Sequence, residues 1–158
     1  GVGKTYYTRR EIVSFFKDLN AKKYTIIVGC GRLGAHLAST LSDKGEDVMI
    51  IDRDSDAFRK LSPSFGGITV QGDAEELLMR GECDIDVAES VISVTDQDNT
   101  NIMVAQIAKE KFNVPRVIAR LYDPARKCVY QELGIDTICP VVLSTQEVYS
   151  LLHKEMAV

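Results

Sequence analysis

Three glycines, Gly29, Gly31 and Gly34, follow a short apolar run at the Gly-x-Gly-x-x-Gly spacing. In dinucleotide-binding folds the first glycine permits a tight turn, the second lets the backbone approach a pyrophosphate, and the third lets a helix pack closely on a strand. Backbone N–H groups at the start of that helix hold phosphates, helped by the helix dipole. The spacing therefore predicts a phosphate-binding loop, whose residues are Gly29, Cys30, Gly31, Arg32, Leu33 and Gly34.

An acidic residue, Asp52, follows the apolar residues 48–51. It lies near the distance of roughly 20 residues at which an acid receives the ribose hydroxyls of adenosine. A carboxylate there repels a 2′-phosphate, so the sequence favours NAD(H) over NADP(H), although the neighbouring Arg53 is placed to meet such a phosphate. The alternative role of Asp52 is to cap a short helix that begins near Asp54.

Polar residues also follow two further apolar runs. Asp73 and Ala74 come after residues 68–71, and Thr95 and Asp96 come after residues 91–94. Ligands of open α/β sheets lie beyond the carboxyl ends of the strands, so we expect these residues to border the adenine and the distal half of the ligand. Helix capping is an alternative for Asp73, and both roles are compatible at one helix N-terminus.

The elements that would position these residues alternate along the chain. Short β-branched runs occur at 24–28, 47–51, 68–71, 91–94, 116–121 and 137–139, and a helix-like segment follows each of them. Such alternation is typical of βαβ units with a parallel sheet. Two helix starts are indicated, one by Asp123-Pro124 and one by a capping box at 144–147. The sequence thus predicts an α/β fold, a Rossmann-like doubly wound parallel sheet of six strands.

Residues 1–23 differ from the remainder and are predicted to be a leader followed by an amphipathic helix, with residues 24–158 forming the nucleotide-binding domain. Thr8 and Glu11 have capping-box spacing, and the apolar positions are Ile12, Val13, Phe15, Phe16 and Leu19. The opening Gly1-Val2-Gly3-Lys4-Thr5 imitates the end of a P-loop, but it lacks the upstream glycine and the preceding strand. We interpret it as a flexible leader.

Composition supports one globular domain and narrows the function classes. The chain has 158 residues, of which 45% are hydrophobic and 27% charged, with a net charge of −4. No apolar run approaches the roughly 20 residues needed to cross a bilayer. The four scattered cysteines, without a secretory signal, indicate a reduced, cytoplasmic protein. A weakly acidic chain without a basic run argues against nucleic acid as a partner.

With these residues in place, the chain resembles the regulator-of-potassium-conductance family, also known as the nucleotide-binding N-terminal domain of Trk potassium-uptake proteins. The resemblance extends from about residue 23 to residue 152. It rests on the segments 24–34, 48–52, 70–74, 94–96 with Asn99-Thr100-Asn101 following, 117–120 and 134–136. An arginine inside the glycine loop, Gly-Asp-Ala after the third strand and the Thr-Asp run after the fourth make it more specific than the loop alone.

This resemblance implies a ligand-sensing regulatory subunit rather than an enzyme. Members bind NAD(H) or adenine nucleotides such as ATP and ADP, form a homodimer or higher ring, and dock at the inner face of the cell membrane under a potassium transporter or channel subunit. Carried over, Arg32 matches a loop arginine that reaches a terminal phosphate, and Arg120 matches a basic residue at the end of the fifth strand. Either arginine is equally compatible with solvation or pairing with acids.

The resemblance also concerns the last helix, which includes Val148, Leu151 and Leu152. A helix after the sixth strand crosses to the partner subunit in the family, so we expect a dimer contact there; the alternative is packing on the chain's own sheet. Members often carry a second ligand-binding domain, so this chain is either a fragment or a nucleotide domain that works alone. We expect the bound nucleotide to switch the relative orientation of paired domains.

Two other classes share parts of the pattern. An NAD-dependent oxidoreductase needs a general acid or base near the nicotinamide, but His36 is expected to face outward and His153 lies near the chain end. An S-adenosylmethionine methyltransferase is opposed by the glycine spacing and by Val28, where an acid would be expected. Two distant histidines and unclustered cysteines offer no metal-ligand set.

Overall fold

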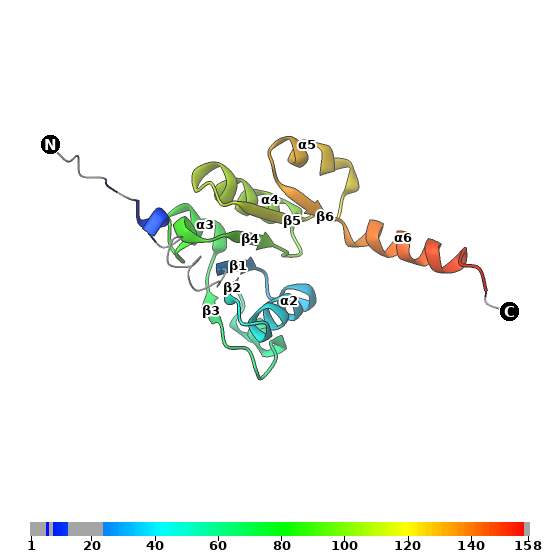
Figure 1. The fold of residues 1–158 in the computed structure, drawn as a ribbon, viewed down its shortest axis with the longest axis horizontal. Coiled ribbons are helices and arrows are strands. Elements are labelled where there is room, and N and C mark those ends of the chain that lie inside the picture. Colours follow the sequence, from blue (N-terminus) through cyan, green and yellow to red (C-terminus); the bar gives the residue numbers. More distant parts are fainter. Residues whose placement is uncertain (1–5, 7, 13–23, 157–158) are drawn as a thin grey trace.

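The computed structural model describes residues 6, 8–12 and 24–156 of the chain. Its centre is a six-stranded, all-parallel sheet of order β3-β2-β1-β4-β5-β6 (Figure 1). The strands are β1 (Tyr24–Val28), β2 (Asp47–Asp52), β3 (Ile68–Gln71), β4 (Ser90–Ser93), β5 (Arg116–Arg120) and β6 (Asp136–Ile138). The predicted doubly wound α/β fold is confirmed, and each predicted strand lies within one residue of its observed bounds.

Helices cover both faces of this sheet. The α-helices are α2 (Arg32–Asp43), α3 (Ala74–Met79), α4 (Asp98–Gln106), α5 (Lys127–Glu132) and α6 (Pro140–Leu152). Shorter helical turns are η1 (Ser55–Lys60), η2 (Ile85–Val87), the π-helical η3 (Ile107–Lys111) and η4 (Pro124–Arg126). Among the described residues, no helix combines the length and the apolar character needed to cross a membrane.

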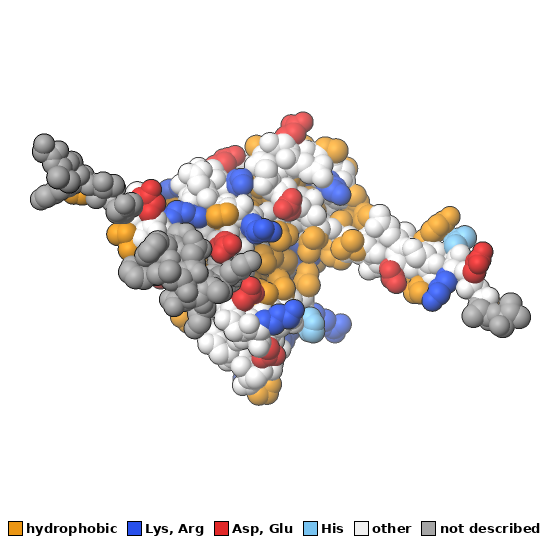
Figure 2. Space-filling model, viewed as in Figure 1, with side chains coloured by type: hydrophobic (Ala, Val, Ile, Leu, Met, Phe, Trp, Pro, Cys, Tyr) orange, Lys and Arg blue, Asp and Glu red, His pale blue; other side chains and the backbone are white. Residues whose placement is uncertain are grey.

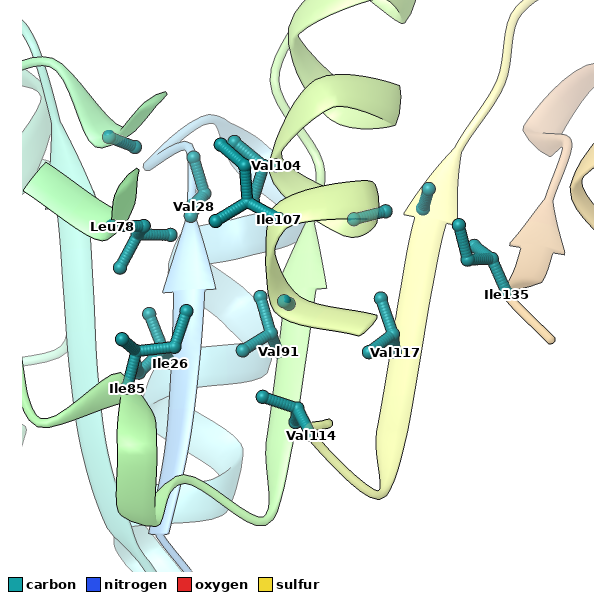
Figure 3. Packing of buried hydrophobic residues seen from close by; sticks show 14 of the residues in the cluster. Ile26, Val28, Leu78, Ile85, Val91, Val104, Ile107, Val114, Val117 and Ile135 are labelled. Atoms are coloured by element: carbon teal, nitrogen blue, oxygen red, sulfur yellow. The ribbon is translucent and has the colours of Figure 1, made fainter. Parts of the chain in front are cut away.

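The central strands β1, β2 and β4 are buried on both faces. Ile26 and Val28 of β1 pack with Leu78 of α3 and Val104 of α4, whereas Ile27 points into a second cluster under α2. Figure 3 shows the first of these clusters, in which side chains of β1 and β4 meet those of α3 and α4. Two separate apolar layers thus hold the strands in register and fix the positions of their carboxyl ends.

The second face is covered incompletely toward β6. Ile118 of β5 and Ile138 of β6 belong to the cluster under α2 but are only partly buried. Figure 2 shows hydrophobic side chains gathered on the surface between α2 and β6, close to the base of α6. This face therefore leaves apolar surface open beside the last helix.

The last helix corrects one prediction. The capping box expected at 144–147 is wrong, because α6 already begins at Pro140, with extended Cys139 before it, and runs through these four residues. A proline at the first helical position starts a helix well, so it overrides a local Ser-x-x-Glu pattern. No residue of α6 is buried, and the helix projects away from the domain (Figure 1).

The described N-terminal residues confirm the capping box predicted at Thr8 and Glu11. The Thr8 hydroxyl accepts from the Glu11 N–H at 3.1 Å, and the Glu11 carboxylate accepts from the Thr8 N–H at 2.6 Å. Arg9 forms ion pairs with Asp84 and Asp86. Val13, Phe15, Phe16 and Leu19, like the P-loop-like residues 1–5, lie outside the described residues, so the predicted leader and helix stay predictions.

Candidate functional site

A cavity of about 420 Å³ opens at the carboxyl ends of the central strands. The chain leaves β1 toward α2 and leaves β4 toward α4, and α2 and α4 cover opposite faces of the sheet. Such a divergence is the topological switch point at which open α/β sheets bind ligands. The predicted site residues that line the cavity are Gly29, Cys30, Gly31, Asp52, Arg53, Asp73, Ala74, Thr95, Asp96 and Arg120.

The three glycines of the loop differ in what an added side chain would meet. Gly29 has φ +101°, and a Cβ there would come within 2.9 Å of the Thr95 backbone nitrogen. A Cβ on Gly34 would overlap the Gly29 carbonyl oxygen. A Cβ on Gly31 would meet no protein atom within 4 Å, although Gly31 lines the cavity. The fold itself therefore leaves space above Gly31, as expected where a pyrophosphate approaches the backbone.

Asp52 lies between the second strand and this loop. Its Oδ2 accepts from the Cys30 N–H at 2.7 Å, and its Oδ1 accepts from the Asp54 N–H at 2.8 Å. The short helix η1 is capped by Asp54, which accepts from the Asp56 N–H at 2.9 Å, and not by Asp52. Each carboxylate oxygen has further lone pairs, so Asp52 can hold the loop and also accept ribose hydroxyls.

Cys30 contributes backbone rather than a thiol to the cavity wall. Its side chain is buried, with Sγ donating to the Ala57 carbonyl oxygen at 3.3 Å. Burial, and then the nearby Asp52 charge, raise the pKa of this thiol above its ordinary value. Cys30 is thus held in the neutral form beneath the loop.

At the end of β3 the predicted helix cap is confirmed, and its residues lie at the cavity wall. Asp73 accepts from the Glu75 N–H at 3.0 Å and caps α3, while Ala74 is buried at the cavity wall. The second Asp73 oxygen pairs with Arg53 Nη2 at 3.1 Å. Arg53 is therefore partly neutralised, which weakens its attraction for a 2′-phosphate beside Asp52.

Thr95, Asp96 and Arg120 form the opposite wall, at the ends of β4 and β5. Arg120 Nη2 donates to the Thr95 carbonyl oxygen at 2.6 Å, and its guanidinium lies 5.1 Å from the centre of the Tyr122 ring. Among the described residues, Arg120 Nε is a buried side-chain nitrogen without a hydrogen-bond partner. Arg120 lines the cavity and has further guanidinium N–H groups, so this wall can offer hydrogen-bond donors to an acceptor oxygen of a ligand.

Three residues of the predicted loop do not line this cavity. Gly34 acts by permitting close packing, and Leu33 packs in the apolar cluster under α2. Arg32 lies instead in a shallow depression on α2 beside His36 and Lys60. Lys60, Gln97 and Thr100 also line the cavity and were not predicted to belong to the site. Gln97 and Thr100 lie shortly after the end of β4, which is a signal that could have identified them, whereas Lys60 ends η1.

Acidic and basic side chains line the cavity, among them Asp52, Asp96 and Lys60. His36 is exposed, as predicted, and the described residues that line the cavity include neither His nor Tyr. Within the described part of the chain, no three His, Cys, Asp or Glu side chains gather closely enough to hold a metal ion. The geometry suits binding of an adenosine ligand with one or more phosphates.

Comparisons with known proteins identify the family of the chain. The family model of the TrkA-N domain matches residues 25–140. The Trk system potassium uptake protein TrkA of Streptomyces coelicolor is 44% identical over 118 residues, which are 75% of this chain and 53% of that protein. The TrkA homolog of Pyrococcus abyssi is 31% identical over 110 residues, or 70% and 48% of the two chains. The chain spans about half the length of these curated relatives.

Solved structures share the fold. The TrkA-N domain of the inner membrane protein ybaL from Escherichia coli has a TM-score of 0.71 at 18% identity, covering 84% of this chain and 98% of that one. The Kef C-terminal domain of Shewanella denitrificans, solved in an AMP-bound form, has a TM-score of 0.64 at 20% identity, covering 84% of each chain. The GsuK channel bound to NAD has a TM-score of 0.61 at 15% identity, covering 75% and 21%.

Proposed function

This chain belongs to the TrkA-N domain family, and on that premise we propose that it is the nucleotide-sensing regulatory part of a potassium uptake system. The observation that carries the proposal is the cavity at the switch point, where the glycine loop, Asp52 and Arg120 converge and where no His or Tyr is among the described lining residues. The curated relatives are named for potassium uptake and not for an enzymatic reaction. Binding, rather than chemistry, is then the task of the site.

The proposed ligand is NAD(H), with ATP or ADP as the alternative. Its adenosine ribose would lie on Asp52, its phosphates over Gly31, and its distal half toward Thr95 and Arg120. The Asp52 charge disfavours the 2′-phosphate of NADP(H). Fold relatives solved with NAD and with AMP support both ligand types, because each ligand contains the same adenosine half.

We further propose that the chain acts as a dimer or as part of a ring. The support is α6, which projects from the domain with Leu143, Tyr149 and Leu152 more than half exposed. The partly buried Ile118 and Ile138 belong to the cluster under α2, and hydrophobic side chains gather on the surface between α2 and β6, close to the base of α6 (Figure 2). A second copy that covers both would remove a large apolar area from water.

In this proposal the ligand changes the relative orientation of the paired domains. A ligand shifts a conformational equilibrium only by its difference in affinity for the two states, and a full reversal needs about 5.5 kcal/mol. In an assembly of coupled subunits, each bound ligand would supply part of this free energy. The movement would then be passed to a membrane potassium transporter or channel subunit. In this arrangement the domain would lie in the cytoplasm, at the inner face of the membrane.

Calorimetric titration with NAD+, NADH, ATP and ADP tests the proposal. We expect saturable binding of at least one of these ligands, and we expect the Asp52→Ala variant to lose binding of every adenosine ligand. Because Asp52 also fastens the loop through Cys30, Gly31→Ala is the second variant, since its added Cβ meets no protein atom. Rapid oxidation of NADH with a small carbonyl substrate would contradict a regulatory role and favour the oxidoreductase alternative.

A further inference from the structure

Asn101, in the second turn of α4, is a fully buried amide with 0% exposure. Burying an amide is unfavourable unless its donors and acceptors are all matched. Asn101 bonds to residues of the cavity wall at the ends of β4 and β5, so its hydrogen-bond partners show which parts of that wall it holds in place.

The Asn101 side chain makes five hydrogen bonds. Its Oδ1 accepts from the Thr95 N–H at 2.8 Å, from the Thr95 hydroxyl at 2.7 Å and from the Ser93 hydroxyl at 3.1 Å. Its Nδ2 donates to the carbonyl oxygens of Thr95 and Arg120, each at 3.0 Å. The backbone partners fix the amide orientation, because an N–H faces Oδ1 and two carbonyls face Nδ2.

These bonds join two strand ends that are far apart in sequence. Thr95 follows β4 and Arg120 ends β5, and both residues line the cavity. The Thr95 carbonyl oxygen receives a donor from Asn101 and another from Arg120 Nη2, at 3.0 and 2.6 Å. Asn101 thus holds both the main chain of Arg120 and the carbonyl that orients its guanidinium.

We propose that Asn101 is a positioning residue that aims Arg120 at an acceptor oxygen in the distal half of a dinucleotide. This assignment rests on the nucleotide site proposed above. Asp52 and Asp73 lie on the other side of the cavity, after β2 and β3, so the adenosine half does not depend on Asn101. Arg120 lines the cavity, and its guanidinium carries N–H donors beyond the one that Nη2 gives to the Thr95 carbonyl oxygen, so it can donate to the distal oxygen.

Calorimetric titration of the full chain with AMP and with NAD+ separates the two halves, because AMP carries only the adenosine half. In Asn101→Ala we expect the affinity for NAD+ to fall roughly tenfold, as for one lost hydrogen bond to a charged group, while AMP affinity stays within about twofold. Ser93→Ala is the matched control. Ser93 bonds the same Oδ1 atom from the core, does not line the cavity and should leave both affinities unchanged.

Arg120→Lys keeps the main-chain acceptor for Asn101 and serves as a second variant should Asn101→Ala fail to fold. It should show the same selective loss, and the double variant should bind NAD+ no more weakly than either single variant, because Asn101 acts through Arg120. Equal weakening of AMP and NAD+, additive losses, or unchanged NAD+ affinity in Arg120→Lys would overturn the assignment. A wild-type chain that binds neither ligand would overturn the proposed nucleotide site itself, and the assignment with it.

Discussion

The Asp52 carboxylate accepts a hydrogen bond from the Cys30 backbone N–H at 2.7 Å, which fastens the end of β2 to the turn after β1. The same carboxylate accepts from the Asp54 N–H, so its position is fixed from two sides. A side chain held in this way needs little reorganisation when a ribose binds. The residue expected to select the ligand is therefore also part of the structure of the loop.

Substitutions of the loop glycines should show that one position affects nucleotide binding and another affects the free energy of unfolding. Gly31→Ala should change the free energy of unfolding by less than about 1 kcal/mol, because its Cβ meets no protein atom, yet it should abolish nucleotide binding. Gly34→Ala should cost roughly 1–3 kcal/mol or more, because its Cβ overlaps the Gly29 carbonyl oxygen. Urea unfolding and calorimetry check both variants. Intact binding in Gly31→Ala would remove this position from the phosphate site.

The choice between NAD+ and NADP+ should depend on Asp73 as well as on Asp52. We expect wild-type protein to bind NAD+ at least roughly tenfold more tightly than NADP+. Asp73→Asn keeps a good cap for α3 but removes the charge that pairs with Arg53, and should narrow this preference. Competition titration with both dinucleotides measures the ratio. An unchanged ratio would show that Arg53 does not reach the 2′-position.

Stability should fall in alkaline solution, and Tyr24 should contribute. Burial, and then nearby negative charges, raise the pKa of the Tyr24 hydroxyl above its unfolded value. Its stabilising contribution is complete below a pH of about 10 and is lost as the pH rises further, because the unfolded chain ionises first. Urea unfolding at pH 8 and pH 11 should therefore show a smaller decrease for Tyr24→Phe than for wild type. Equal decreases in the free energy of unfolding would show that other groups cause the loss of stability at high pH.

The exposed last helix should control the oligomeric state. Leu152→Asp, at a side chain 74% exposed on α6, should convert a dimer to a monomer at micromolar concentration. Ile68→Asp places the same charge on a side chain 58% exposed at the β3 edge, at the opposite end of the sheet, and should leave the dimer intact. Size-exclusion chromatography with light scattering compares the two variants. A wild-type monomer would contradict the dimer proposal.

Much of the fold could be predicted because its signals are local. The run at 24–28 coincides with β1, since burial on both faces demands a continuous apolar strand, and the run at 68–71 coincides with the exposed edge strand β3 through its β-branched residues. The cap at Asp123-Pro124 was likewise predicted, and Asp123 accepts from the Ala125 N–H at 3.0 Å. The capping box at 144–147 failed because Pro140 had already started the helix.

The hydrogen bonds by which Asn101 holds the wall of Thr95, Asp96 and Arg120 could not be predicted, because they depend on the adjacency of β4 and β5. Residues 93 and 95 meet residue 120 only after the crossover through α4 has placed β5 beside β4. Arg32 illustrates a second limit. It shares the outer side of α2 with His36, four residues on, so helix rotation takes it from the cavity although it belongs to the loop motif.

A thermal-shift panel with NAD+, NADH, NADP+, ATP, ADP and S-adenosylmethionine tests the central claim most directly. A ligand that binds only the folded state adds about 2.7 kcal/mol at 100 times its dissociation constant, or roughly 5–10 °C in Tm for a chain of this size. We predict that NAD(H) or ATP/ADP raises the Tm of wild-type protein but not of Gly31→Ala. Stabilisation by S-adenosylmethionine alone, or by none of the six ligands, would contradict a nucleotide-sensing domain.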